Sequence, residues 1–525
     1  MSKNNSLSKH KTAPETLLKH DESAVTRRNF IKTGAAAGSM AMLARPSRAA
    51  RLANANGKKT KKRAPNIVFI ISDQLNIDAI ARYKEHFKDV AYGGHWVRTP
   101  NLDRLAQEGY SFIESQSCDP VCSPSRSCIF TGRMASETGV VHNNIGIAKD
   151  VPNIGQWFEA HTDYRRIYCG KWHLGGHWNY PTVSGPRRPP GWDVLPVGGS
   201  GVGIYVDPQV ADSASAFIAN DVGDTPYLLV ASLMNPHDIC YFATNLDGKR
   251  STPESDIYHL GEKLPILPPN FHYHFEEPPG QGPYDGFHGE SQWRNYIYDY
   301  YRMVEQVDEH VGRIMKAIRE RNDDTLVVFT ADHGEALARH HRIEKWHPFQ
   351  PSEKVPFIVW SPKRVKSGVL DTDHMICNVD IISTFCDYAG IEPPPLHRGF
   401  SVRPIVDIEG VGVHNWRQEL YTEWQITGRT IRTKRYKWAM RYRYSGDFHK
   451  PFIRKSDGVH TQFVPGHGED YEEYPEQLLF DLESDPWELN NLVKDLQYAS
   501  VIKQHREILR EWEAKLIPGK NYNRN

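Results

Sequence analysis

The run Pro65-Asn66-Ile67-Val68-Phe69-Ile70-Ile71 decides the fold class of this 525-residue chain. Its five consecutive apolar residues are typical of a strand buried on both faces of a parallel sheet, because a strand with one wet face alternates apolar and polar residues. Similar runs recur at residues 227–232, 325–330 and 356–360. The clearest helical pattern, over about 292–321, has one apolar face: Val304, Val307, Val311, Ile314 and Ile318. Alternating strands and helices predict an α/β sheet covered by helices on both faces.

The pattern of expected secondary structure changes after about residue 410. Residues 429–433 and 436–442 have the composition of strands in a smaller antiparallel unit, and a final helix is expected at about 499–516. We therefore expect a large α/β domain over residues 65–410 and a C-terminal subdomain over residues 411–525.

The first fifty residues have the pattern of an export signal. Residues 26–32, Thr-Arg-Arg-Asn-Phe-Ile-Lys, match the twin-arginine pattern, and the apolar stretch 33–43 is too short and too weakly apolar for a membrane span. Small residues suited to cleavage follow at 44–50. We expect residues 1–50 to direct a bacterial protein through the twin-arginine export machinery to the periplasm or beyond, with an N-terminal amphipathic helix as the alternative. The basic stretch within 51–64 is interpreted as a solvated linker, with an anionic-surface anchor as the alternative.

Charge and cysteine content narrow the class of protein. Lys+Arg and Asp+Glu both total 64, but residues 1–50 hold nine of the cations and three of the anions, so the remainder is mildly acidic. Nucleic-acid binding needs a basic footprint and is therefore not expected. The aromatic fraction of 11% suits a carbohydrate-handling surface and equally a plain aromatic core. Seven cysteines at this length do not indicate a dense disulfide scaffold.

Polar clusters follow the predicted strands, and ligands of open α/β sheets bind outside the carboxyl ends of strands. A lone Asp there can equally cap a turn, and a lone His can equally be a hydrogen-bonded core residue. The clusters are Ser72-Asp73-Gln74, Gly170-Lys171-Trp172-His173, Asn235-Pro236-His237-Asp238 and Asp332-His333-Gly334-Glu335, with Lys345 ten residues before Val355.

The string Cys122-Ser123-Pro124-Ser125-Arg126, followed by Thr131-Gly132-Arg133, resembles the type I sulfatase signature C-x-P-S-R with T-G-R downstream. Residues 101–106 and 485–492 also match runs of that family, so the resemblance covers nearly the whole chain after residue 64. It implies an alkaline-phosphatase-like fold, with a large mixed, mostly parallel sheet sandwiched by helices and a smaller C-terminal antiparallel sheet plus helix.

The resemblance also implies a role for each cluster. A maturation enzyme would oxidise Cys122 to formylglycine, whose hydrate is the nucleophile, and Arg126 would stabilise that hydrate. One hydroxyl would attack sulfur and release the alcohol. A base, His173, would then take the proton of the other hydroxyl, so that sulfate is expelled. The expected metal ligands are Asp73, Gln74, modified Cys122, Asp332 and His333, and the residues expected to hold sulfate oxygens are Lys171, His237 and Lys345.

Physical chemistry supports cations at this position, because attack on a sulfate ester concentrates charge on its oxygens. Pro124 is well placed to begin a helix, whose N-terminus would add backbone N–H groups beside the sulfate.

Two positions depart from the family pattern. Many members have Asp-Asp where this chain has Asp73-Gln74, and many have Asn where His333 stands. Calcium is expected because the family usually binds it, but calcium prefers oxygen ligands, so magnesium and manganese stay open.

We expect a sulfuric ester hydrolase that acts on a sulfated carbohydrate during polysaccharide degradation. One alternative is a formylglycine-dependent phosphonate monoester or phosphodiester hydrolase. Another is a catalytically dead glycan-binding protein that uses the basic-aromatic segment 435–455, although that segment equally fits two strands with a solvated face. A two-zinc phosphatase is disfavoured because it needs a Ser or Thr nucleophile.

Overall fold

The computed structural model describes most of the chain after the predicted signal and linker. The described residues are 64–175, 188–198, 201–241, 264–273, 284–287, 289–413, 415–424, 427–444, 471–473 and 477–517. The predicted signal region, residues 1–50, and all of the predicted linker except residue 64 lie outside them. None of the helices among the described residues is long and apolar enough to cross a membrane.

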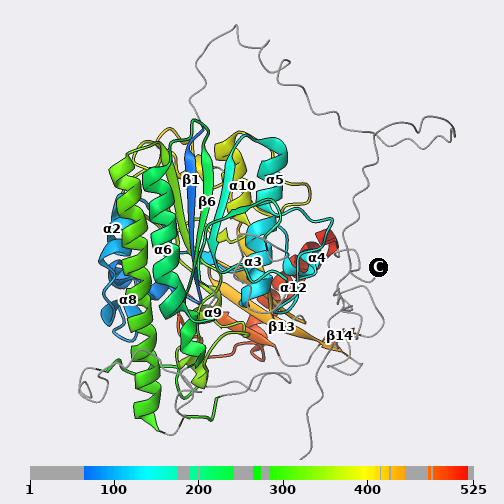
Figure 1. Ribbon diagram of the computed structural model, residues 1–525. Coiled ribbons are helices and arrows are strands. Elements are labelled where there is room, and N and C mark those ends of the chain that lie inside the picture. The colour runs from blue at the N-terminus through cyan, green and yellow to red at the C-terminus, as the bar shows by residue number, and fades with distance from the viewer. Residues whose placement is uncertain are drawn as a thin grey trace, which may run out of the picture. The chain divides into compact units, whose positions relative to one another are not determined.

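A large sheet forms the centre of the fold (Figure 1). It has eight strands, in the order β5-β4-β6-β1-β7-β8-β2-β9. β1 lies between β6 and β7 and is parallel to both. Only β8 is antiparallel, to β7 and to β2, so the sheet is mixed and mostly parallel, as predicted. The strands are β1 (Asn66–Asp73), β2 (Tyr110–Phe112), β4 (Arg165–Gly170), β5 (Asp193–Val194), β6 (Tyr227–Pro236), β7 (Thr325–Ala331), β8 (Phe357–Trp360) and β9 (Val369–Asp371).

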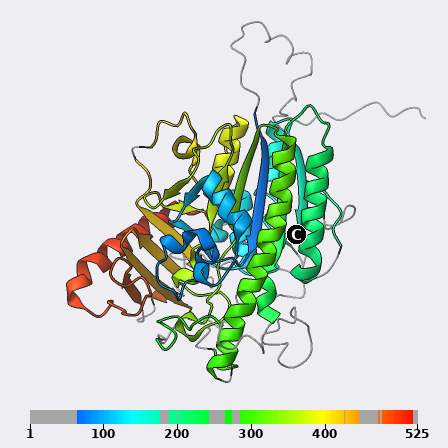
Figure 2. The ribbon, with the colours of Figure 1, turned by 90° about the vertical axis from the view of Figure 1, so that its left-hand side faces the viewer.

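Helices cover both faces of this sheet (Figures 1 and 2). The side chains of β1 explain this arrangement, because they pack into two cores. Val68 and Ile70 face a core shared with α6 (Gly203–Asn220), α8 (Glu290–Arg321) and α2 (Pro100–Glu108). Ile67, Phe69 and Ile71 face the opposite core. That core is shared with α3 (Cys122–Thr131), α5 (Ile154–His161) and α10 (Asp380–Ala389). The unbroken apolar run is therefore a strand with two dry faces.

The predicted elements agree with the observed ones to within a few residues. α8 begins at Glu290, and the five apolar residues that predicted it are buried. β8 begins at Phe357 because Pro356 has no N–H to donate to the sheet. Strand β4 was not predicted: its sequence, Arg-Arg-Ile-Tyr-Cys-Gly, lacks both the alternating and the continuous apolar pattern.

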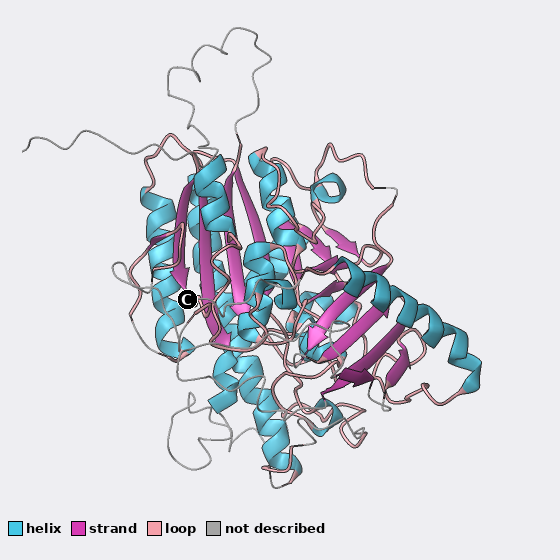
Figure 3. Ribbon diagram, turned by 90° about the vertical axis from the view of Figure 1, so that its right-hand side faces the viewer, coloured by secondary structure: helices cyan, strands magenta, loops and turns pink. Residues whose placement is uncertain are grey.

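A second, antiparallel sheet follows residue 410, and α12 (Ala499–Lys515) lies along one of its faces (Figure 3). The predicted C-terminal sheet and helix are therefore confirmed, while the domain boundary at residue 410 stays a prediction. The strands of this sheet are β11 (Glu419–Trp424), β12 (Gly428–Thr433), β13 (Tyr436–Tyr444), β14 (Tyr471–Glu473) and β15 (Leu478–Asp481).

Short elements complete the described chain. β3 (Ser115–Gln116) and β10 (Ile376–Cys377) form a small parallel pair beside the start of α3. The others are α4 (Ala135–Thr138), α9 (Gln350–Glu353), α11 (Arg403–Val406) and the 3-10 helices η1 (Ile77–Ala79), η2 (Ala81–Glu85), η3 (Gly93–His95), η4 (His237–Tyr241), η7 (Arg339–His341) and η8 (Leu496–Tyr498).

Candidate active site and metal centre

Cys122 is the first residue of α3, and the helix start points it at the carboxyl ends of β1 and β7. Val121 before it is extended, Pro124 lies in the first turn as predicted, and only 1% of Cys122 is exposed. Its Sγ lies 3.2 Å from His333 Nε2 and 3.8 Å from Asp73 Oδ1. The fold therefore brings the signature cysteine to two strand-end clusters that are far from it in sequence.

Four predicted metal ligands meet at this point. One possible ligand atom from each of Asp73, Cys122, Asp332 and His333 lies within 4.8 Å of the others, and all four residues are buried. Asp73 ends β1 and Asp332 follows β7, and these two strands are neighbours in the sheet. His333 Nδ1 lies 2.9 Å from the Gly334 carbonyl oxygen. When Nδ1–H donates there, Nε2 presents its lone pair to the cluster.

This donor set fits a divalent cation. Two carboxylates supply the hard oxygen ligands that calcium, magnesium and manganese prefer, whereas an imidazole nitrogen is more typical of softer metals such as zinc and iron. Burying two like charges this close together is costly without compensating positive charge. The residues therefore suit a metal centre, although the donor set alone does not select calcium.

Arg126 ties the two carboxylates together. Its Nε donates to Asp332 Oδ2 at 2.8 Å, and its Nη2 donates to Asp73 Oδ2 at 3.1 Å. Its Nη1 donates to the Lys171 carbonyl and to Ser232 Oγ. Burial lowers the pKa of Arg126, but Asp332 and Asp73 raise it above its ordinary value. The guanidinium therefore stays charged and fixes the orientation of both carboxylates.

Lys171 and two histidines line the other side of the cluster. Strand β4 delivers Lys171, whose Nζ lies 2.5 Å from Asp73 Oδ2. Ser123 Oγ in α3 donates to the backbone carbonyl of His173, and His237 begins η4 directly after β6. Burial and the charge of Lys171 hold the pKa of each histidine well below its ordinary value. Both imidazoles are therefore uncharged at neutral pH and able to accept a proton.

Gln74 turns away from these carboxylates toward Lys345. Its Nε2 donates to Glu335 Oε2 at 2.5 Å, and its Oε1 accepts a hydrogen bond from Lys345 Nζ at 2.6 Å. Glu335 Oε1 in turn accepts from Tyr296 Oη at 2.6 Å and from the Glu344 amide at 2.6 Å. The amide oxygen predicted to bind metal therefore has a lysine as its partner.

The electrostatic balance at Cys122 favours negative charge. Burial raises the pKa of Cys122, and Asp73 raises it further. Lys171, Lys345 and His333 lower it, and the net pKa lies below that of an ordinary thiol. An anion at this position is therefore stabilised by two lysines from separate segments, and by His333 when its imidazole is protonated.

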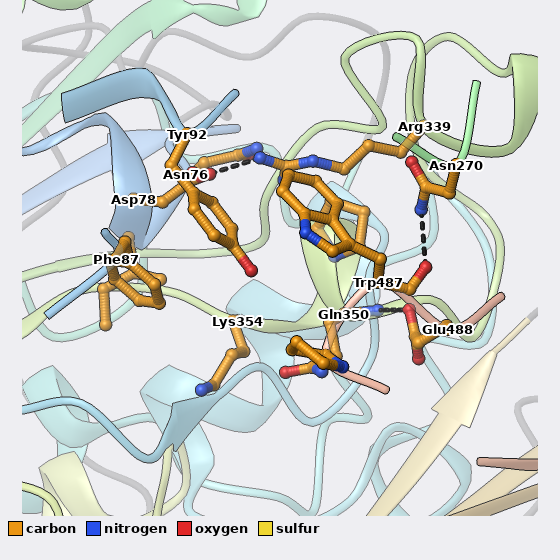
Figure 4. Close-up of a pocket in the computed structure, with 13 residues that line it drawn as sticks. Asn76, Asp78, Phe87, Tyr92, Asn270, Arg339, Gln350, Lys354, Trp487 and Glu488 are labelled. Atoms are coloured by element: carbon orange, nitrogen blue, oxygen red, sulfur yellow. Dashed lines mark hydrogen bonds and ion pairs between the residues drawn. The ribbon is translucent and has the colours of Figure 1, made fainter. Parts of the chain in front are cut away.

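A separate pocket lies between the residues that follow β1 and the C-terminal residues Trp487 and Glu488, which line it together (Figure 4). The rings of Tyr92 and Trp487 stack there at 4.4 Å, and the Arg339 guanidinium lies over both. None of the predicted site residues lines this pocket. The family-like run 485–492 is therefore placed at a structural junction, separate from Cys122.

A family model described as Sulfatase matches residues 65–391, which is more than half of the chain. The chain belongs to the sulfatase family. It is a sulfatase enzyme, and the resemblance inferred from the signature is confirmed. A second model, described as N-sulphoglucosamine sulphohydrolase, C-terminal, matches residues 338–462 of this sulfatase.

Similar proteins cover most of the sulfatase. An N-acetylglucosamine-6-O-sulfatase of Bacteroides thetaiotaomicron is 24% identical over 87% of this chain and 88% of its own length. A solved 2-O GAG sulfatase is 23% identical, with a TM-score of 0.66 over 86% of this chain and 92% of that one. A phosphonate monoester hydrolase from Silicibacter pomeroyi is 19% identical, with a TM-score of 0.63 over 86% of this chain and 96% of that one. At these identities, the two structures show a shared fold.

The predicted site residues of the sulfatase occupy one buried region, and sequence reasoning missed some of their partners. Glu335 belongs to a cluster that was noted, but nothing in the sequence indicated its contact with Gln74. Tyr296 resembles any aromatic residue on the buried face of a helix. Cys240, whose Sγ lies 3.3 Å from Lys345 Nζ, follows His237 in a short 3-10 helix and had no recognisable pattern.

Proposed function

We propose that this sulfatase removes sulfate from a sulfated glycan after Cys122 has been oxidised to formylglycine. The observation that carries the proposal is the convergence of Cys122 with Asp73, Asp332 and His333 inside 4.8 Å. Two lysines add positive charge around it, as the effect on the pKa of Cys122 indicates. A metal-binding pair of carboxylates beside an anion-stabilising nucleophile suits an anionic ester.

The protein's own residues would divide the work as follows. Lys171 and Lys345 would hold the sulfate oxygens, and uncharged His237 would donate a hydrogen bond to them. Arg126 would keep Asp73 and Asp332 in place. His173 is uncharged and tied to the first turn of α3, so it would accept a proton from a hydroxyl at position 122. The oxidised residue would supply a hydrated aldehyde in place of the thiol.

A divalent cation would be held by Asp73, Asp332 and His333 Nε2, together with an oxygen at position 122. When bound, it would neutralise charge on the reacting oxygens and make a bound hydroxyl more acidic. We propose calcium, with magnesium and manganese as alternatives. Elemental analysis of the purified protein, followed by replacement of the metal after chelation, identifies the ion.

Gln74 would act as a positioning residue for Lys345. Glu335 accepts a hydrogen bond from its amide nitrogen, which fixes the amide with its oxygen toward Lys345 Nζ. An Asp at position 74 would present a charged oxygen to a metal, whereas the amide here bridges a carboxylate and a lysine. We propose that this bridge sets the direction in which Lys345 meets the sulfate.

Mass spectrometry of the Cys122 peptide tests the catalytic proposal most directly. Protein produced together with a formylglycine-generating enzyme should carry an aldehyde at position 122 and release sulfate from an aryl sulfate. Cys122→Ala, which cannot be converted, is the matched control. An unmodified Cys122 in fully active protein would contradict the mechanism.

The glycan substrate is proposed from the relatives. An N-acetylglucosamine-6-O-sulfatase and a solved 2-O GAG sulfatase both cover most of the chain. The second matching model is likewise named for a sulphated glucosamine. Sulfate release from a panel of defined sulfated oligosaccharides and from small aryl and choline sulfates separates glycan from non-glycan substrates. Activity confined to choline sulfate would overturn the glycan assignment.

A phosphonate monoester or phosphodiester hydrolase is the second candidate function. The observation that favours it is His333, because the Asp-His pairing resembles that of some formylglycine-dependent hydrolases of those esters. Paired 4-nitrophenyl esters of sulfate and phenylphosphonate distinguish the two. We expect the larger kcat/KM for the sulfate ester, and the reverse order would favour the second candidate.

Export through the twin-arginine route is proposed from residues 26–32. Because that machinery carries folded proteins, oxidation of Cys122 by the maturation enzyme would precede export. Replacing Arg27 and Arg28 together by Lys should retain the protein in the cytoplasm. Cell fractionation with a cytoplasmic marker measures this, and unchanged export of the double variant would contradict the proposal.

A further inference from the structure

Three thiols gather outside the active site, in the core between α3 and the C-terminal sheet. Cys118, Cys128 and Cys377 are 0%, 0% and 3% exposed, and they belong to one apolar cluster that also contains Met134 and Met375. None of the three contacts the metal ligands described above. A buried cysteine usually packs as a small apolar residue, so burial alone assigns these thiols no chemistry.

The distance between two of these sulfurs is what distinguishes them. Cys118 Sγ lies 2.8 Å from Cys377 Sγ. The sulfur contacts of Cys122 and Cys169 are longer, with 3.2 Å from Cys122 to His333 and 3.5 Å from Cys169 to a carbonyl oxygen. A disulfide bond is about 2.05 Å long, so the two sulfurs need to approach by less than about 1 Å.

The backbone already holds the two segments side by side. β3 and β10 are parallel partners, with Ser115 opposite Ile376 and Gln116 opposite Cys377. The backbone N–H of Asn378 donates to the backbone carbonyl of Gln116 at 3.2 Å. A bond between the sulfurs would therefore connect two strands that are already paired, although 259 positions separate the cysteines in sequence.

We propose that Cys118 and Cys377 are a modification site and form a disulfide when the chain meets a disulfide-bearing oxidant. One thiolate attacks the oxidant and forms a mixed disulfide. The second thiolate then displaces the oxidant's remaining thiol. Each cysteine loses one proton, the S–S bond forms, and the two electrons reduce the oxidant's disulfide to two thiols. Cys128 stays reduced.

The bond would stabilise the segment that leads into the active site. Cys118 lies four residues before Cys122, and its carbonyl accepts a hydrogen bond from the Glu423 amide at 2.9 Å. A covalent link to β10 would fix this segment to the main domain as well. Closing so long a loop reduces the entropy of the unfolded chain. Because both sulfurs are buried, the oxidant reaches them only while the core is open.

The test uses the full-length chain and needs no sulfatase activity. Purified reduced protein is incubated with a glutathione redox buffer in urea below the unfolding midpoint, which allows local opening. It is then alkylated and digested with trypsin without reduction. Cys118, Cys128 and Cys377 fall in separate peptides, 105–126, 127–133 and 367–398. We expect a linked pair of 105–126 with 367–398, and fragment spectra assign its sulfurs to Cys118 and Cys377.

Two outcomes overturn the proposal. One is full alkylation of Cys118 and Cys377 at every urea concentration, and the other is a bond from Cys118 to Cys128. Dithiothreitol should lower the melting temperature of the oxidised protein by about 5 °C. Cys377→Ser should lose this response, whereas Cys128→Ser, the matched control from the same cluster, should keep it.

Discussion

Two clusters of buried charge differ in what their charges contact. At the active site, charged groups from α3 and from the carboxyl ends of β1, β4 and β7 converge on Cys122. In the second cluster, Lys437 of β13 contacts the carboxylate of Glu488 and lies 3.7 Å from Glu353. Its Nζ also donates to the Pro348 carbonyl at 2.5 Å. The first cluster surrounds a reactive atom, and the second consists of partners for one lysine.

The pKa values of Asp73 and Glu353, one carboxyl group from each cluster, are shifted in opposite directions. At the active site, burial raises the pKa of Asp73, but Lys171, His237 and Arg126 together hold it well below its ordinary value. In the second cluster, burial outweighs the attraction of Lys437 and raises the pKa of Glu353 to about 7. At Asp73 the surrounding cations therefore outweigh burial, whereas burial and the charge of Asp73 raise the pKa of its neighbour Asp332.

The largest effect on turnover is expected from removing the sulfur atom of Cys122, around which the active-site cluster is arranged. Cys122→Ala should reduce kcat by more than about 10⁴-fold, because no hydrate can form at that position. Its melting temperature should stay within a few degrees of the wild type. Sulfate release and thermal unfolding measure the two effects. Cys386→Ala, at a buried cysteine of α10, is the control and should keep its turnover.

The next largest effect is expected from metal removal. Chelation should lower turnover by about 10³-fold and also lower the melting temperature, because a bound metal stabilises the folded state and adds positive charge beside Asp73 and Asp332. Adding back calcium, magnesium or manganese identifies the ion that restores both. Glu488→Gln, in the second cluster, should leave this metal dependence unchanged. If chelation changed neither property, the four residues around Cys122 would not be a metal centre.

Much of this architecture could be predicted from the sequence, because the signals are local. A continuous apolar run predicted β1, and helical periodicity predicted α8 to within two residues of its start. The strand-end position of Asp73 and Asp332 predicted that they would meet, since neighbouring parallel strands end at the same edge of a sheet. Strand β4 was missed because it begins with the polar residues Arg165 and Arg166. Whether such a segment forms a strand depends on the strands beside it in the fold, which local sequence does not reveal.

The orientation of Gln74 could not be predicted, because it depends on residues distant in sequence. Glu335 and Lys345 approach it from a different segment and bind opposite ends of its amide. Sequence spacing places residue 74 beside Asp73 but does not determine the side-chain direction. The role of Glu488 was missed for the same reason, since its partner Lys437 lies in β13 and is distant in sequence.

Lys437→Met tests whether the second cluster is structural. Removing the lysine leaves the carboxylate of Glu488 buried without its main partner, which should reduce the free energy of unfolding by about 3 kcal/mol. Turnover of the folded protein should change by less than about threefold, because Lys437 does not contact Cys122. Denaturant titration and activity measure the two effects.

Lys434→Met is the matched control for that change. Lys434 is close to Lys437 in sequence, but its side chain and that of its partner Asp373 are 63% and 80% exposed. Its removal should change stability by less than about 1 kcal/mol. If Lys437→Met abolished turnover without loss of stability, the distinction between the two clusters would be wrong.

Gln74→Asn tests the side of the active site that faces Lys345. The shorter amide cannot span Glu335 and Lys345 together, so KM should rise by about tenfold, equivalent to one lost hydrogen bond to a charged group. The metal content should stay at the wild-type value. Steady-state kinetics measures KM and elemental analysis measures the metal content, so together they distinguish a positioning role of Gln74 from metal binding. A loss of metal with unchanged KM would make Gln74 a metal ligand, as the family resemblance implied.

The last effect is expected from Glu353→Gln and depends on pH, with an upper limit of about 3 kcal/mol set by the pKa shift. Burial raises the folded-state pKa of Glu353 from 4.5 to about 7, so ionisation costs stability as pH rises through this interval. The variant should therefore be more stable than the wild type at pH 8 and equal to it at pH 5, as measured by urea denaturation. Glu483→Gln, whose side chain is 75% exposed, is the control and should show no such difference. If the variant were less stable at pH 8, the attraction of Lys437 would outweigh burial. The second cluster would then hold Glu353 ionised, as the active site holds Asp73.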